Sequence, residues 1–258
     1  MLTGMFITLE GGEGSGKSTQ IRSLRNRLKR RNVPVTMVRE PGGTPLGDLM
    51  RQMLKFATTP LTPKAELLLF NASRAQLVTD VIRPALEKGE VVLCDRFTDS
   101  TLAYQGYGRG ISLAQVEEVN KAATDGLKPD LTVLLDIPPE EGIERQFTAK
   151  ERFEGGFVQQ ETTNPEQRGS QGFLMDIHSD VSLRGQPIGR EQLEGERGRA
   201  NILDFHHRVH QGYLELARIE PDRWLTLDAR LSPPQVARLI WQRVEPLVRE
   251  MEIAKKAP

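Results

Sequence analysis

One stretch decides the fold of this chain: MFITLEGGEGSGKST, residues 5–19. Its start, residues 5–9, is mostly apolar and predicts a buried strand, and the helical pattern that follows puts Ile21, Leu24 and Leu28 on one face. Between the two stands Gly-x-x-x-x-Gly-Lys-Ser at residues 11–18, the P-loop motif in the strand–loop–helix context that it requires. That context disfavours the alternative, a glycine-rich turn that matches by chance. The stretch therefore predicts a nucleoside triphosphate site.

The motif supplies the parts of a site for triphosphate and Mg²⁺. Glycines allow backbone N–H groups to turn towards phosphate oxygens, and the start of the next helix adds the positive end of its dipole. Lys17 can reach the β- and γ-phosphates, and the Ser18 hydroxyl can bind Mg²⁺. The residues expected to bind the triphosphate are Gly11, Gly12, Glu13, Gly14, Ser15, Gly16, Lys17, Ser18 and Thr19.

Composition excludes several classes of protein. The 258 residues include 35 basic and 35 acidic side chains, so no overall field favours nucleic acid or a membrane surface. A single cysteine, Cys94, excludes a disulfide framework and is expected to pack in a buried strand rather than to act as a nucleophile. The chain shows neither an apolar stretch as long as a membrane span nor a signal-peptide pattern, and a cytoplasmic location is expected.

Short apolar runs alternate with helical patterns along the chain. Strands are predicted at residues 5–9, 33–38, 90–94, 131–137 and 224–227. Helices are predicted at 45–56, 63–87, 112–126, from 138 onward, 199–217 and after 234, and Pro84 should kink or end the second of these. The alternation is typical of a three-layer α/β fold of the P-loop NTPase type, in which helices flank a five-stranded parallel sheet. We expect one domain, residues 1–258.

Polar residues follow the carboxyl ends of three strands, where parallel sheets gather phosphate ligands. The P-loop follows the first strand, Arg39 the second, and Asp95 and Arg96 the third. Asp95 stands where a Walker-B carboxylate organises Mg²⁺, so the predicted metal ligands are Ser18 and Asp95. Arginines at two strand ends suit an anionic second substrate, and the chain lacks the Asn-Lys-x-Asp sequence that reads guanine. These features favour a kinase over a GTPase.

Residues 149–193 interrupt the alternation. They are rich in Gln, Glu, Gly, Ser and Arg without a sustained apolar period, and they predict a mobile polar insertion in the lid region. A small recognition segment around residues 173–177 is the alternative. Further on, His206 and His210 have a spacing that could bind a metal. No acidic or cysteine ligand completes such a site, so we expect surface or packing histidines.

Several segments beyond the P-loop occur in an order typical of one family. They are LEGGEGSGKS (9–18), REPGGT (39–44), LLFxAxRxQ (68–76), DRFxxSTxAYQG (95–106), and PDLT (129–132) with Leu135 and Asp136. On these segments the chain resembles the bacterial thymidylate kinases over nearly its whole length apart from the insertion. REPGG and AYQG distinguish this family from adenylate, guanylate and cytidylate kinases. The resemblance implies phosphorylation of dTMP to dTDP with Mg-ATP, a step of dTTP biosynthesis.

The resemblance also implies roles for residues of the acceptor site. Arg39 and Arg96 would clamp the phosphate of dTMP, because guanidinium forks suit phosphate oxygens. Phe70 would stack on thymine, and Arg74 and Gln105 would hydrogen-bond the edge of the base. Tyr104 would lie against the sugar, and Glu13 near the 3′-hydroxyl group. The implied dTMP site is thus Glu13, Arg39, Phe70, Arg74, Arg96, Ser100, Tyr104 and Gln105.

Each of these residues also has a simpler interpretation. Taken singly, Phe70 could be a core residue, Arg74 a solvated helix charge, and Gln105 a cap in a loop.

The transfer reaction needs no strong general base, because a monophosphate is already largely dianionic at neutral pH. Catalysis is then alignment and charge neutralisation, for which the expected residues are Lys17, Arg39, Asp95, Arg96 and a lid arginine, Arg197.

The lid is where the chain departs from the family. Gly14 occupies the position at which some thymidylate kinases carry a catalytic arginine, so the arginine should come from the lid. Arg197 is the first candidate and Arg199, Arg190 and Arg152 are its rivals; Arg145 is implied near the adenine side of ATP.

Two other functions remain open at the level of sequence. One is a nucleotide-binding regulatory module with an impaired lid, because Ala200 replaces the family's acidic lid residue. The other is a nucleoside monophosphate kinase of shifted base specificity. The resemblance also implies a homodimer, formed through the helices around residues 45–85 and 112–125.

Overall fold

Five parallel strands form the sheet in the computed structural model of the chain, which describes residues 3–156 and 196–254. They are β1 (Met5–Glu10), β2 (Val35–Arg39), β3 (Val91–Asp95), β4 (Leu131–Asp136) and β5 (Trp224–Asp228). Their order across the sheet is β2-β3-β1-β4-β5, and every pairing is parallel. The predicted five-stranded parallel sheet is confirmed.

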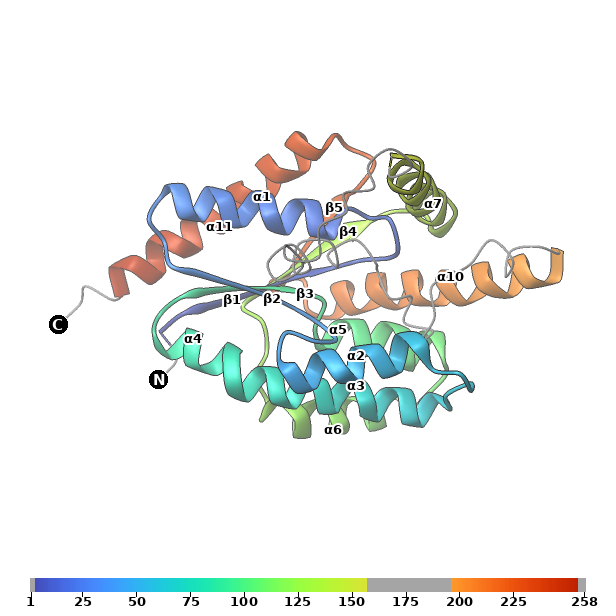
Figure 1. The fold of residues 1–258 in the computed structure, drawn as a ribbon. Helices are drawn as coiled ribbons and strands as arrows, with labels where there is room; N and C mark the ends of the chain where they lie inside the picture. The colour runs from blue at the N-terminus through green and yellow to red at the C-terminus, as the bar shows by residue number, and fades with distance from the viewer. Residues whose placement is uncertain (1–2, 157–195, 255–258) are drawn as a thin grey trace, which may run out of the picture.

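Helices cover both faces of this sheet (Figure 1). On the upper face in that view, α1 (Lys17–Arg30) packs against α11 (Pro233–Ala254). Below the sheet lie α2 (Pro45–Phe56), α3 (Pro63–Leu77), α4 (Arg83–Glu87), α5 (Thr98–Thr101) and α6 (Leu113–Thr124). The two long helices that flank the lid region are α7 (Pro139–Gly156) and α10 (Glu196–Ile219).

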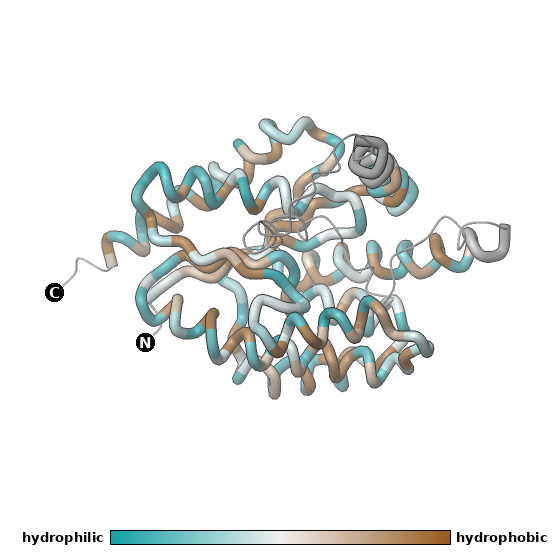
Figure 2. Tube along the Cα trace, in the orientation of Figure 1, coloured by the Kyte–Doolittle hydropathy of each residue, from teal (hydrophilic) through white to brown (hydrophobic). Residues whose placement is uncertain are grey.

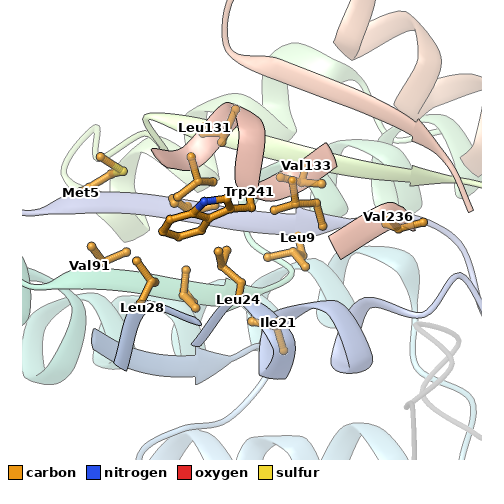
Figure 3. Close-up of a cluster of buried hydrophobic side chains, with 14 of the residues drawn as sticks. Met5, Leu9, Ile21, Leu24, Leu28, Val91, Leu131, Val133, Val236 and Trp241 are labelled. Atoms are coloured by element: carbon orange, nitrogen blue, oxygen red, sulfur yellow. The ribbon is translucent and has the colours of Figure 1, made fainter. Parts of the chain in front are cut away.

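Alternation along the strands supplies both layers with apolar side chains. From β1, Met5, Ile7 and Leu9 join the larger core cluster, in which Trp241 of α11 lies beside side chains of α1 (Figure 3). Phe6 belongs to the cluster on the other face, together with Cys94. Cys94 is fully buried, as expected for a packing residue, and burial raises the pKa of its thiol. Figure 2 shows hydrophobic residues along the central strands and polar ones along much of the outer helices.

The chain stays helical through Pro84, although this residue was expected to kink or end the helix. After α3 the winding widens into a π-helical segment, η1 (Val78–Ile82), and α4 then begins at Arg83. The N–H of Arg83 donates to the carbonyl oxygen of Val78, five residues back. Pro84 therefore stands in the first turn of a new helical segment, where a missing N–H costs little.

Two further helical segments differ from expectation. No helix was predicted for residues 98–108, but α5 is followed there by η2 (Leu102–Gly108), which packs along α10. In addition, α7 reaches Gly156 and so includes residues 149–156 of the predicted insertion. The rest of that insertion, with the possible recognition segment at 173–177, lies outside the described residues.

Candidate active site

The P-loop leads from β1 into α1, which begins at Lys17. Gly11 has a φ of +139° and Gly16 a φ of +93°, regions that favour glycine and let the backbone curl. The Lys17 side chain is buried, and its Nζ donates to the carbonyl oxygens of Gly11 at 3.2 Å and Gly12 at 3.0 Å. The lysine side chain is therefore folded back over the loop.

The middle of the P-loop lies against the first turns of α7. Gly14 has a φ of +64°, and a Cβ atom there would collide with the carbonyl oxygen of Gly142. A Cβ atom on Gly142 would in turn collide with the carbonyl oxygen of Glu13. Two glycines thus let the backbones touch, and position 14 has no room for an arginine.

The ends of β2 and β3 bring the predicted acceptor residues to the same edge. Arg39 and Asp95 are partners in the register of the two strands. Arg96 comes next with a φ of +71°, which is uncommon for a residue other than glycine and typical of functional sites. Its Nη1 donates to the carbonyl oxygen of Gly11 at 3.0 Å, the same oxygen that accepts from Lys17. Two cationic side chains therefore meet at one atom of the P-loop.

Further predicted residues surround the Arg96 guanidinium, which is buried. Glu13 Oε1 lies 3.5 Å from Arg96 Nη2 and accepts a hydrogen bond of 3.2 Å from the Tyr104 hydroxyl. The guanidinium also lies over the Tyr104 ring, 5.1 Å from its centroid, and Nη1 donates to Ser100 Oγ at 3.4 Å. The structure thus groups Glu13 of the P-loop with Arg96, Ser100 and Tyr104 of the segment that follows β3.

The two predicted metal ligands also lie together. Ser18, in the first turn of α1, donates its hydroxyl to Asp95 Oδ2 at 3.0 Å. Residues 3–156 and 196–254 contain no group of three or more His, Cys, Asp or Glu side chains that could hold a metal ion. A hydroxyl and one carboxylate suit Mg²⁺, which keeps several waters and takes phosphate oxygens as its other ligands.

Known proteins share this arrangement of segments. A family model described as thymidylate kinase matches residues 9–171, more than half of the chain. This chain belongs to the thymidylate kinase family. It is 46% identical over 243 residues to the thymidylate kinase of Roseiflexus sp. strain RS-1, a match that covers 94% of each chain. It is 43% identical over 244 residues to that of Deinococcus radiodurans, covering 95% of this chain and 98% of the relative.

A solved structure supports the same assignment. The crystal structure of thymidylate kinase from Ehrlichia chaffeensis is 29% identical and has a TM-score of 0.59, covering 87% of this chain and 92% of its own. The fold is accordingly the P-loop NTPase fold, and the chain is an enzyme of the kinase class. The reaction of thymidylate kinases is the phosphorylation of dTMP to dTDP.

Arg74, expected at the base edge of the thymidylate kinase site, is buried and fully engaged by the protein. Its Nε and Nη2 bind the Glu40 carboxylate, whose pKa is raised by burial and only partly lowered by this arginine. The remaining donors reach Asn71, Phe97, Thr101 and Asn120. All five N–H groups thus have acceptors. To contact a base, Arg74 would have to give up one of these hydrogen bonds for a bond to the base. The contact between Arg74 and the base stays a prediction.

The other predicted base contacts are also buried. Phe70 and Tyr104 lie in one apolar cluster, so the structure accommodates both the core and the stacking interpretation of Phe70. Gln105 Nε2 donates to Glu66 Oε1 at 2.8 Å. Its Oε1 is buried and has no hydrogen-bond partner among the described residues. A buried acceptor without a partner is uncommon in folded proteins and is what a bound donor would satisfy.

Glu10 was not predicted as a site residue, although it lies directly beneath the site. At the end of β1 it accepts hydrogen bonds from the Phe97 N–H at 2.8 Å and from the hydroxyls of Ser100 and Tyr213. Burial, reinforced by the neighbouring charge of Asp99, raises the pKa of Glu10 to about 8. A lone carboxylate at the end of an apolar strand was the signal that could have found it.

The remaining predicted residues lie further from this group or outside the description. Arg39 Nη2 is 3.8 Å from Asp48 Oδ1, and Arg145 of α7 donates to the carbonyl oxygen of Ala229 at 2.8 Å. His210 bonds Asp136 at 2.6 Å, while His206 is buried. Arg197 stands in the first turn of α10, but its side chain and those of Arg199 and Arg152 are outside the description, as is the whole of Arg190.

Proposed function

We propose that this enzyme transfers the γ-phosphoryl group of ATP to dTMP at the junction of Lys17 and Arg96. One observation carries the proposal: both cations donate to the carbonyl oxygen of Gly11. Like charges this close repel each other, and an anion held between them relieves the repulsion. The ATP phosphates in the P-loop and the phosphate of dTMP supply such anions, and their junction is where charge develops during transfer.

Arg39 would form the second arm of the acceptor clamp. It ends the strand next to Asp95, so its guanidinium and that of Arg96 arise from adjacent strand ends. Two guanidinium forks can bind the oxygens of one phosphate group from different sides and fix its direction of attack. No proton needs to be removed by a strong base, because the acceptor phosphate is largely dianionic at neutral pH.

Ser18 and Asp95 would hold Mg²⁺. Their oxygen atoms are 3.0 Å apart, so both already face the same small volume beside the P-loop. Mg²⁺ held there would neutralise part of the negative charge of the ATP phosphates. Lys17, whose Nζ donates to the carbonyl oxygen of Gly12, would approach the same phosphates from the loop side.

The acceptor nucleoside would lie over Tyr104, with its base beside Phe70 and Gln105. Tyr104 is held by Glu13, so the sugar would meet a ring and a carboxylate whose positions are coupled. The unpaired Oε1 of Gln105 supports a base contact through a ring N–H. The lid arginine Arg197 would complete the charge around the transferring group, and Arg145 would lie towards the adenine side.

We also propose that the enzyme is a cytoplasmic homodimer. Four large apolar side chains of α2 are more than two-fifths exposed and recur three or four residues apart: Leu46, Leu49, Met53 and Phe56. Such a stripe on the surface of one helix is typical of a protein contact. Within residues 3–156 and 196–254, no helix combines the length and apolarity that a membrane span needs.

A substrate panel tests this proposal. ADP production is measured at saturating Mg-ATP with dTMP, dUMP, UMP, CMP, AMP and GMP as acceptors. We expect a strong preference for dTMP. Equal turnover of UMP would contradict the proposed base site, and binding of both nucleotides without turnover would favour the regulatory module instead.

A further inference from the structure

We infer that Glu66 sets the base preference of the acceptor site by fixing which end of the Gln105 amide is offered to the base. The inference rests on the proposed function, in which Gln105 contacts the base of dTMP. It adds a positioning residue that does not itself touch the nucleotide.

Glu66 lies in the first turn of α3 with its side chain 1% exposed. Its Oε1 accepts from Gln105 Nε2 at 2.8 Å and from Arg109 Nε at 3.3 Å, and its Oε2 accepts from Arg109 Nη2 at 2.7 Å. The carboxylate is therefore held between an amide of η2 and a guanidinium that follows it. Both contacts are charge-assisted because a carboxylate is the acceptor in each, and such hydrogen bonds are stronger than those between neutral groups.

The chemistry of these groups decides the orientation of the amide. The oxygen and nitrogen ends of a glutamine amide have nearly the same shape, so only their hydrogen-bond partners distinguish them. A carboxylate paired with arginine offers acceptors only, so the NH₂ end of Gln105 must face Glu66. The carbonyl end is then the one left over, and Oε1 is indeed buried without a partner among the described residues.

An amide fixed in this way discriminates between bases. The carbonyl oxygen left over can accept a hydrogen bond from the N3–H of thymine or uracil. It opposes the lone pair that cytosine carries at N3. Burying an acceptor against a lone pair leaves both unpaired, and sites that depend on such bonds reject the wrong partner strongly. If the amide were free to turn, its NH₂ end could serve cytosine, and the preference would weaken.

The variant Glu66→Gln tests the inference, because it keeps the size of the side chain but offers Gln105 either an acceptor or a donor. The readout is the ratio of kcat/KM for dTMP to kcat/KM for dCMP. We expect this ratio to fall about tenfold or more, mainly through a higher KM for dTMP. The matched control is Glu87→Gln on the exposed end of α4, which should leave the ratio unchanged.

A double-mutant cycle separates orientation from general damage. Gln105→Met removes the amide at similar length, so Glu66→Gln should have no further effect on the ratio in that background. A fall of the same size in both backgrounds would overturn the inference, because Glu66 would then act by another route. If thermal melting shows that Glu66→Gln does not fold, Glu66→Asp replaces it. Aspartate keeps the negative charge beside Arg109 but is too short to hold the Gln105 amide, so the same fall in the ratio of dTMP to dCMP is expected.

The outcomes are distinguishable from failure of the proposed function. A wild-type enzyme without any preference for dTMP over dCMP would contradict the proposed base site and this inference with it. A wild-type preference that persists in folded Glu66→Gln and Glu66→Asp would overturn this inference alone.

Discussion

Arg96 is the residue on which the acceptor half of the site depends. Its backbone is in an uncommon conformation, and its guanidinium reaches the P-loop, Glu13 and Ser100 at once. Arg96→Lys keeps the charge but loses the fork, so it cannot align a phosphate in the same way. We expect kcat/KM for dTMP to fall about 10²–10³-fold. Steady-state kinetics with varied dTMP measure the effect.

The control for this substitution is ATP binding. Since Arg96 is assigned to the acceptor side, the affinity of the folded variant for ATP should change little. An unchanged kcat/KM for dTMP, or a loss confined to ATP binding, would contradict the assignment of Arg96 to the phosphate of dTMP.

Arg197 is assigned to the lid on sequence grounds alone. If it stabilises the charge of the transition state, Arg197→Ala should lower kcat about 10³-fold or more. Arg199→Ala, two residues on, is the matched control and should have a much smaller effect. Single-turnover rates at saturating nucleotides measure the transfer step. A larger loss in Arg199→Ala would exchange the two assignments.

Glu10 introduces a pH dependence into stability. A carboxyl group whose pKa is raised on folding, here to about 8, binds more protons in the folded than in the unfolded chain. Its contribution to the free energy of unfolding is complete below its unfolded pKa and is lost as pH rises through the folded value. Glu10→Gln stays neutral and removes this loss.

Thermal melting of the wild type and Glu10→Gln at about pH 5 and about pH 8.5 tests this expectation. The melting temperature of the variant relative to the wild type should rise by about 2–4 °C or more between the two conditions. A constant difference would mean that Glu10 does not change its protonation in this range.

At the scale of elements, the contact between the P-loop and α7 leaves no room for a side chain at Gly14 or Gly142. Gly142→Ala would place a methyl group against the backbone of Glu13, and backbone cannot yield as a flexible side chain can. We expect a stability loss of about 1–3 kcal/mol and a higher KM for ATP, because the loop must shift. Glu144→Ala, exposed on the same helix, is the control. Urea unfolding and ATP kinetics measure both effects, and a fully stable Gly142→Ala with wild-type KM would contradict the contact.

Elements with a local signal could be predicted from sequence, and those defined by distant partners could not. The bounds of α2 follow from Thr44, whose side chain caps the N–H of Gly47, and from Pro45 in the first turn. The winding of η1 depends on Pro84 several residues later, and a sequence pattern shows only that a helix is disturbed there. The length of α7 was missed because polar helices lack an apolar period.

The site shows the same division. The P-loop and the strand-end residues could be found because their spacing is fixed by local chain geometry. The hydrogen bonds of Arg74 could not be predicted, because one of its partners, Asn120, is 46 residues away in sequence. The pairing of Glu10 with Tyr213 joins residues 203 apart. Such contacts depend on the packing of whole layers.

At the scale of the whole molecule, the apolar stripe on α2 predicts the oligomeric state. Phe56 is 66% exposed and Met53 58% exposed, so burying them in a second copy would remove much apolar surface from water. We expect a dimer that becomes monomeric in Met53→Glu/Phe56→Glu, because two carboxylates would be buried without partners.

Light scattering coupled to size exclusion measures this state directly. Ile253→Glu, at an equally exposed position of α11, is the control and should leave the dimer intact. A monomeric wild type would contradict the proposed dimer. Dissociation by Ile253→Glu rather than by the α2 variant would place the dimer contact at α11 instead of α2.

The anchoring of Tyr213 in the floor of the site has a mechanical consequence. Arg197 and Tyr213 stand on one continuous helix, and the span between them is about 24 Å at the usual rise per residue. A tilt of about 5° at the tyrosine therefore moves the backbone of Arg197 by about 2 Å. The hydroxyl of Tyr213 donates to Glu10, so a change in this contact that tilts the helix would be amplified towards its N-terminal end. A substitution near Tyr213 would therefore change the position of Arg197 without any change at Arg197 itself.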